Sequence, residues 1–269
     1  MTSGILILGS GGREHAIAWK LAQTVQKVRI APGNGSPFGA VDLDISDPEA
    51  ILAYCAQDGL DLVVVGPEIP LAQGIVDKLQ DRIAIFGPTQ EGARLETSKA
   101  FAKTFMQQNG IPTAEFAEFT LLADALNYIE RCSWDGIVVK ADGLAAGKGV
   151  VVCTNKEEAR EAARNILQRL LEKDAGPNTG GMGVVGPVTV PKAIDEQISA
   201  ILHQTIKGLQ EQRIFYTGII YAGFMITSKG PYVLEYNCRF GDPETELFHL
   251  IPMTSSLFML VQRLLMGSW

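Results

Sequence analysis

The chain has 269 residues, of which 46% are hydrophobic, and its formal net charge is −7. This length allows one large or two modest domains with a sizeable core. The negative charge argues against nucleic acid or an anionic membrane surface as partner, so an anionic ligand must be held by local groups. The four cysteines lie far apart without a CxxC pair, and we expect reduced thiols of a cytoplasmic protein. The sequence has no apolar run long enough to predict a secretion signal or a membrane-spanning segment.

The first ninety residues repeat a unit of strand, turn and helix. Short apolar runs end at glycine-containing turns, and each is followed by a helical pattern or a helix start signal. This order predicts a small parallel sheet of the doubly wound type. The expected strands are 5–8, 28–31, 62–65 and 83–86, and the expected helices are 14–24, 48–58 and 71–79, the second with Asp47 as its N-cap.

The rest of the chain mixes long helical patterns with short strands. Ser228-Lys229-Gly230 stands between two strand patterns and predicts a hairpin turn. The fold class is therefore α/β, with a parallel sheet first and an α+β part after it. The expected helices are 98–109, 123–131, 157–171, 194–212 and 255–266, and the expected strands are 136–140, 150–153, 218–227 and 232–237.

The stretch YVLEYNCRFGDPETE, residues 232–246, is the most informative part of the sequence. Strict alternation would place Val233, Glu235 and Asn237 on one face of a strand, with Tyr232, Leu234 and Tyr236 on the other. A carboxylate and a carboxamide side by side are suited to a hard cation such as magnesium. The competing interpretation is an edge strand with a solvated face and an acidic turn.

Three glycine-rich segments are candidates for contact with phosphates. GSGGREH, residues 9–15, lies between the first strand and the first helix, where backbone N–H groups favour an anion, although a plain tight turn is equally compatible. VVKADGLAAGKGVVV, residues 138–152, is a glycine loop with two lysines between two strands. GPNTGGMG, residues 176–183, has almost no bulky side chain and is either a disordered linker or a loop that brings backbone N–H groups against a ligand. Among the histidines only His15, beside the first turn, is expected to be near a ligand.

Together these segments resemble a known family. GSGGREH, APGN, VVVGPE, LETSKAFAK, VVKADGLAAGKGV, KDAGPNTGGMG, YTGIIYAG and LEYNCRFGDPET occur in this order over nearly the whole chain. They are similar to the phosphoribosylamine–glycine ligases, or glycinamide ribonucleotide synthetases, of the ATP-grasp superfamily. The resemblance implies a Rossmann-like pre-ATP-grasp domain over residues 1–92, followed by a shortened ATP-grasp core with its small-domain portion at 93–168 and its large-domain portion at 169–269.

The resemblance also implies an activity in de novo purine biosynthesis. Glycine would be joined to 5-phosphoribosylamine through a glycyl phosphate, giving 5-phosphoribosylglycinamide, ADP and phosphate. ATP would be a substrate, and Mg²⁺ or Mn²⁺ the cofactor. No protein nucleophile is needed, so catalysis would rest on positioning and electrostatics. A monomer is favoured, with small-molecule substrates as the only partners.

The resemblance assigns roles to particular residues. The residues implied in substrate binding are Gly9, Gly11, Gly12, Arg13, Glu14, Asn34, Pro67, Glu68, Asn178, Thr179, Gly180, Gly181 and Met182. Those implied in ATP binding are Lys99, Lys140, Gly143, Gly147, Lys148 and Gly149. Arg239, Asp242 and Lys148 are implied in catalysis, and Glu235 and Asn237 in metal binding.

The sequence also departs from the family pattern. No hinge strands stand between the helix ending near Leu167 and the loop that starts at Lys173, and the connection after Asn34 is short. The family also continues into a C-terminal β-rich domain, whereas this chain ends at Trp269. One alternative is therefore a catalytically silent module that binds phosphoribosyl ligands. Another is an ATP-grasp ligase acting on aminoimidazole ribonucleotides.

Overall fold

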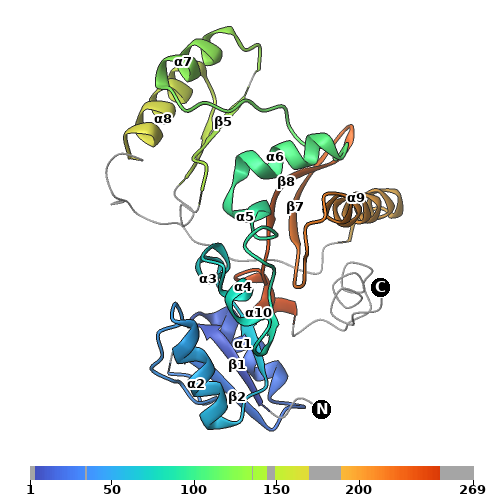
Figure 1. Cartoon of the computed structure of the whole chain (residues 1–269). Helices are drawn as coiled ribbons and strands as arrows, with labels where there is room; N and C mark the ends of the chain where they lie inside the picture. The colour runs from blue at the N-terminus through green and yellow to red at the C-terminus, as the bar shows by residue number, and fades with distance from the viewer. Residues whose placement is uncertain (1–3, 34, 135, 144–148, 170–188, 249–269) are drawn as a thin grey trace.

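The computed structural model describes residues 4–33, 35–134, 136–143, 149–169 and 189–248. The architecture is α/β, as predicted. An N-terminal parallel sheet lies at one end of the molecule and a small two-stranded unit at the other, with the hairpin β7–β8 between them (Figure 1). Within the described part of the chain, no helix has the length and apolar character needed to cross a bilayer.

The N-terminal sheet has four parallel strands in the order β2-β1-β3-β4. Helix α1 packs on one face, and α2, α3 and α4 pack on the other, so the sheet is doubly wound as predicted. All six residues of β1 are buried. The elements are β1 (Gly4–Gly9), α1 (Gly12–Leu21), β2 (Lys27–Pro32), α2 (Pro48–Asp58), β3 (Leu62–Val65), α3 (Glu68–Ala72), α4 (Ile75–Leu79) and β4 (Ala84–Phe86).

Local sequence signals explain most of these boundaries. Asp47 caps α2, its side chain accepting hydrogen bonds from Glu49 N and Ala50 N at 2.9 and 3.3 Å. The single helix predicted over 71–79 is wrong. Gly74 adopts the left-handed conformation, with φ +71°, and separates α3 from α4.

The middle of the chain forms a small unit with one covered sheet face. The strands β5 (Ile137–Lys140) and β6 (Val150–Cys153) pair antiparallel, and α7 (Leu122–Arg131) and α8 (Lys156–Arg169) pack against them. Val138 and Val152 are paired across the strands and remain 49% and 74% exposed. Before this unit come α5 (Arg94–Thr97), which was not predicted, and α6 (Lys99–Gln108).

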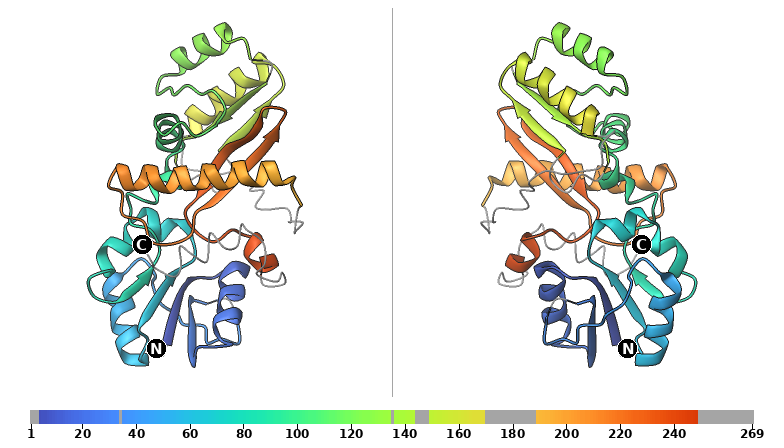
Figure 2. Two further views of the ribbon diagram at one scale, coloured as in Figure 1. Left: turned by 90° about the vertical axis from the view of Figure 1, so that its right-hand side faces the viewer. Right: turned by 90° about the vertical axis from the view of Figure 1, so that its left-hand side faces the viewer.

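The predicted hairpin is confirmed and forms the third part. Strands β7 (Tyr221–Thr227) and β8 (Gly230–Asn237) pair antiparallel, and α9 (Lys192–Glu211) lies across them (Figure 2). Buried residues of α6, α9 and β8 share one core cluster. The short helix α10 (Glu244–Phe248) follows and contacts α1 of the N-terminal domain.

The strict alternation expected along β8 is wrong in one respect. The pairing passes from Gly223 with Glu235 to Phe224 with Val233, so Leu234 is the extra residue of a β-bulge. Val233 and Tyr236 consequently share the core, at 0% and 2% exposure, while Glu235 is exposed. Glu235 and Asn237 lie two residues apart beyond the bulge and still share a face, as predicted.

Several predictions fall outside the described residues. These are the helix over 255–266, the glycine loop over 176–183 and the C-terminal end of the helix expected over 157–171. The proposed domain limits, 1–92, 93–168 and 169–269, stay predictions.

Candidate functional site

Arg239 joins three distant parts of the chain. Its Nε lies 3.0 Å from Oε2 of Glu68, at the start of α3, in an ion pair misaligned for a hydrogen bond. Its Nη2 lies 2.9 Å from Oε1 of Glu96, on α5. The other oxygen of Glu96 accepts a hydrogen bond from Cys238 N at 2.7 Å. The end of β8 is thus tied to the N-terminal domain, and Arg239 and Glu68, both predicted site residues, are brought together.

Glu96 is a site residue that the sequence analysis did not assign. Its side chain is 8% exposed, and burial raises the pKa of its carboxyl group, while the nearby Arg239 guanidinium opposes that shift. An acidic residue on a short helix within the LETSKAFAK motif was the only available signal. Its pairing with Arg239 depends on tertiary structure.

Glu235 and Asn237 lie at the end of β8, beside this network. Asn237 Oδ1 accepts a hydrogen bond from Arg239 Nη2 at 3.4 Å. The described residues contain no group of three or more His, Cys, Asp or Glu side chains suited to a metal ion. Magnesium typically uses one or two protein oxygens and completes its shell with substrate phosphates and water. The two side chains therefore suit a divalent cation held jointly with a ligand.

Two of the three lysines predicted to bind ATP, Lys99 and Lys140, lie near the start of the loop that follows β5. Lys99 Nζ donates a hydrogen bond to Gly143 O at 2.8 Å, and Asp142 Oδ1 accepts one from Ala100 N at 3.2 Å. Burial lowers the pKa of Lys99, with the carboxylate of Asp142 opposing the shift. Lys140 ends β5, and Gly149 O accepts a hydrogen bond from Ala141 N at 2.6 Å. The start of this loop is thereby fixed to the N-terminus of α6.

The glycine turn after β1 is occupied by a protein carboxylate. Glu14 is 1% exposed, pairs with Arg13 Nε at 2.5 Å, and accepts a hydrogen bond from Gly11 N at 2.7 Å. A β-carbon on Gly9, which has φ +124°, would lie 2.6 Å from Glu14 Cδ. The absence of a side chain at Gly9 therefore makes room for Glu14.

Two further carboxylates surround the same turn. A β-carbon on Gly12 would lie 2.7 Å from Glu246 Oε1, and one on Gly11 would lie 3.6 Å from Asp242 Oδ2. Glu246 Oε2 is buried and has no hydrogen-bond partner among the described residues, and burial raises the pKa of this carboxyl group. The carboxylates of Asp242 and Glu246 and the buried Arg13–Glu14 pair therefore surround the turn.

The remaining predicted residues divide into two groups. Pro67 precedes α3 as its N-cap, next to Glu68, and His15 packs edge-on against Phe38 with ring centroids 5.4 Å apart. The others lie outside the described residues, and their placement stays a prediction. These are Asn34, Gly147, Lys148, Asn178, Thr179, Gly180, Gly181 and Met182.

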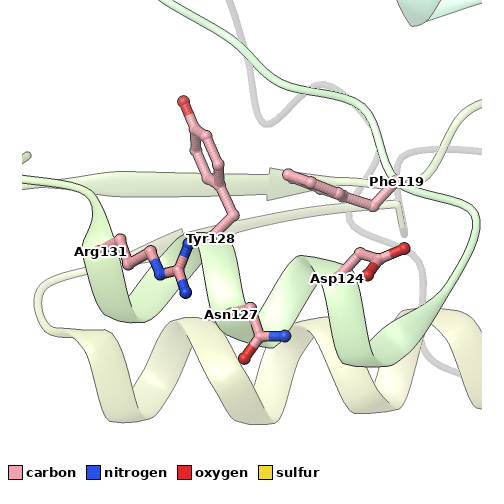
Figure 3. Close-up of a pocket in the computed structure, with 5 residues that line it drawn as sticks. All are labelled: Phe119, Asp124, Asn127, Tyr128 and Arg131. Atoms are coloured by element: carbon pink, nitrogen blue, oxygen red, sulfur yellow. The ribbon is translucent and has the colours of Figure 1, made fainter.

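A separate surface groove contains none of the predicted site residues. It has a volume of about 260 Å³ and lies along α7 (Figure 3). Phe119 and Tyr128 stack in a tilted arrangement, with ring centroids 5.1 Å apart. The lining residues are Phe119, Asp124, Asn127, Tyr128 and Arg131. The geometry around Arg239 and Lys99 is the better candidate for chemistry.

Comparison with protein families finds two matching domains. Residues 3–96 match the phosphoribosylglycinamide synthetase N domain. Residues 97–169 and 167–245 match the ATP-grasp (A) domain of the same synthetase in two pieces. The pieces meet where the sequence analysis found hinge strands missing.

Individual relatives agree with the domain matches. The chain is 42% identical to phosphoribosylamine–glycine ligase of Ralstonia nicotianae, over 98% of this chain and 74% of that protein. It is 41% identical to the human trifunctional purine biosynthetic protein adenosine-3, over 99% of this chain but only 32% of that protein. The human alignment runs over 323 residues whereas this chain has 269, so the relative carries segments without a counterpart here.

A solved structure supports the same assignment. The crystal structure of phosphoribosylamine–glycine ligase from Thermotoga maritima matches with a TM-score of 0.77 and 31% identity, over 99% of this chain and 76% of that one. The fold therefore agrees with the two domain matches. The chain belongs to the phosphoribosylglycinamide synthetase family, with an N domain followed by an ATP-grasp domain.

Proposed function

We propose that this chain carries out the ATP-dependent ligation of glycine to 5-phosphoribosylamine, in cytoplasmic purine biosynthesis. The observation that carries the proposal is the ion pair between Arg239 and Glu68, with 3.0 Å between Nε and Oε2. This ion pair joins the start of α3 in the N domain to the residues that follow β8, the strand that bears Glu235 and Asn237. A phosphorylated glycine and an amine on a ribose would therefore meet within one site.

The reaction has two steps that balance without a protein nucleophile. An oxygen of the glycine carboxylate attacks the terminal phosphorus of ATP, and the bond to ADP breaks. The amine of phosphoribosylamine then attacks the glycyl carbon, phosphate leaves, and the amine loses a proton. The guanidinium of Arg239 offsets negative charge on the acyl phosphate, and Lys99, Lys140 and Lys148 bind the nucleotide phosphates. A magnesium or manganese ion at Glu235 and Asn237 would supply neutralisation of phosphate charge.

The acidic turn refines how the sugar binds. Because Glu14, Asp242 and Glu246 surround Gly11 and Gly12, a hydroxyl or amine is favoured there electrostatically. We therefore place the ribose hydroxyls and the amine of phosphoribosylamine near this turn and Glu68. The 5-phosphate then points away from these carboxylates.

The competing functions are less well supported. A silent binding module would have no need for the Glu235–Asn237 pair at the end of β8. The solved structures of N5-carboxyaminoimidazole ribonucleotide synthetases share only 14–19% identity with this chain. Such a low identity supports a common fold and does not support a common substrate.

The test is the substrate dependence of ADP release. Phosphoribosylamine is generated in place from ribose 5-phosphate and ammonia, and ADP is measured with each substrate omitted in turn. We expect ADP release only when glycine, phosphoribosylamine and ATP are all present. Turnover with aminoimidazole ribonucleotide instead of phosphoribosylamine would favour the other ligase. Tight binding of ribose phosphates without any nucleotide turnover would favour the silent module.

A further inference from the structure

Lys103 lies in the same cluster as the two described lysines of the proposed nucleotide site. It follows Lys99 by four residues on α6, so both side chains leave the same face of the helix. The charge of Lys140, at the end of β5, acts on both Lys99 and Lys103. Three ammonium groups from two elements are therefore gathered near the loop that begins at Ala141.

The described carboxylates do not neutralise this cluster by direct pairing. Some cations elsewhere pair with carboxylates, for example Lys27 with Asp58 at 3.0 Å. Within the described ranges, by contrast, none of Lys99, Lys103 and Lys140 has a carboxylate oxygen within ion-pair distance. Gathering like charges in a half-buried place is unfavourable unless an anion joins them.

The ammonium group of Lys103 is held by a defined chain of hydrogen bonds. Its Nζ donates to Thr113 Oγ1 at 2.6 Å, and that hydroxyl donates to Val233 O at 2.7 Å. Thr113 also forms a parallel bridge with Val233, beside the bulge of β8. Nζ has two further hydrogens to donate, so this anchoring leaves capacity for a ligand oxygen.

We propose that Lys103 binds the polyphosphate of the nucleotide together with Lys99 and Lys140. The inference rests on the proposed function, since it assumes that a nucleotide occupies this site. It extends the site by one residue that the family-like motifs did not assign. The signal was available in the sequence as the spacing of Lys99 and Lys103 within SKAFAK.

The charge state of Lys103 supports a measurable pH dependence. Burial, with the charge of Lys140 adding to it, lowers the pKa of Lys103 to about 8. The other charged groups here are Lys99 on α6 and three carboxylates whose charges act on Lys99. These are Asp142 after β5, Glu235 on β8 and Glu96 on α5. An arginine at position 103 would stay charged throughout the range, since its guanidinium does not deprotonate below pH 12 or so.

The experiment measures the affinity of MgADP by calorimetry at pH 7 and pH 9. We expect K103M to bind MgADP at least about tenfold more weakly than the wild type at pH 7, because the loss of a charged hydrogen bond typically reduces affinity by this much. K103R should bind within a few-fold of the wild type at pH 7. Wild-type affinity should fall between pH 7 and pH 9 more than that of K103R. K192M changes an 89% exposed lysine on α9 and should leave affinity unchanged.

The outcomes separate the two proposals. Equal affinity of K103M and wild type, with equal pH dependence of wild type and K103R, overturns the role of Lys103 alone. A wild type that does not bind MgADP overturns the proposed function as well. T113V tests the anchoring: a drop in affinity smaller than that of K103M is expected. If K103M fails to fold, the comparison of wild type with K103R across pH decides the question.

Discussion

Glu14 and Gly66 fit together at the carboxyl ends of β1 and β3. A β-carbon at position 66 would lie 2.1 Å from Glu14 Oε1 and 2.7 Å from Leu8 O. In doubly wound sheets of this strand order, the crevice between these two strands is the usual ligand site. Here the buried side chain of Glu14 occupies that crevice.

Replacing Gly66 by alanine should destabilise the protein. The buried Glu14 side chain and the backbone at Leu8 have little freedom to move, so we expect a loss of about 2 kcal/mol in the free energy of unfolding. Urea unfolding measures this loss. G136A is the matched control, because among the described residues no atom beyond its chain neighbours lies within 4 Å of the added methyl group. Equal stabilities of the two variants would contradict the close fit of Glu14 and Gly66.

Removing Arg239 should cost both stability and activity. R239A leaves Glu96 buried without its cation, which we expect to lower the free energy of unfolding by about 3 kcal/mol. R82A removes the exposed ion pair with Glu49 instead and should change the free energy of unfolding far less, because solvent screens exposed pairs. Chemical unfolding and ADP release are measured on both variants. The role of Arg239 is wrong if R239A matches R82A in both.

The N-terminal fold could be predicted from sequence because its signals are local. Leu62–Val65 is a short apolar run bounded by turn residues, and β3 has those limits. The division between α3 and α4 was missed because apolar residues continue on both sides of Gly74, and the left-handed conformation of one glycine is not visible in periodicity. The β-bulge at Leu234, which puts Val233 on the core face together with Tyr236, was missed because a bulge depends on the pairing of β8 with β7.

Glu235 should be needed for turnover but not for folding. Its side chain is exposed at the end of β8, so E235A should change the free energy of unfolding by no more than about 0.5 kcal/mol. Loss of a proposed metal ligand should lower magnesium-dependent ADP release by roughly 100-fold. E211A, at another exposed glutamate, serves as the control. ADP release at the wild-type rate in E235A would rule out the metal assignment.

Lys103 should make stability rise with pH in the alkaline range. Its pKa is about 8 in the folded protein, against an ordinary value of 10.5. Between these values the unfolded chain binds more protons, so the free energy of unfolding increases with pH as far as this group is concerned. The difference between wild type and K103M, measured by urea unfolding from pH 7 to pH 10, isolates the contribution. A difference that stays constant over this range would contradict the lowered pKa.

The candidate site could be predicted only in part. Glu235 and Asn237 follow from their spacing on one strand, and Lys99 from a motif at a helix start. The partners of Arg239 could not be predicted, because Glu68 and Glu96 approach it through packing of α3, α5 and β8. The carboxylates around Gly11 and Gly12 were missed for the same reason, since Asp242 and Glu246 come from the far end of the chain.

The bulge at Leu234 means that the two arms of the hairpin differ in length. Gly223 and Phe224 are neighbours on β7, yet their partners Glu235 and Val233 are separated by one residue on β8. Deleting Leu234 would give a regular ladder in which Val233 and Tyr236 still face the core and Glu235 and Asn237 still face outward. The hairpin can therefore be shortened by one residue while each of these four side chains stays on its present face. Such a deletion would remove the additional local twist that a bulge gives to the strand beside Glu235.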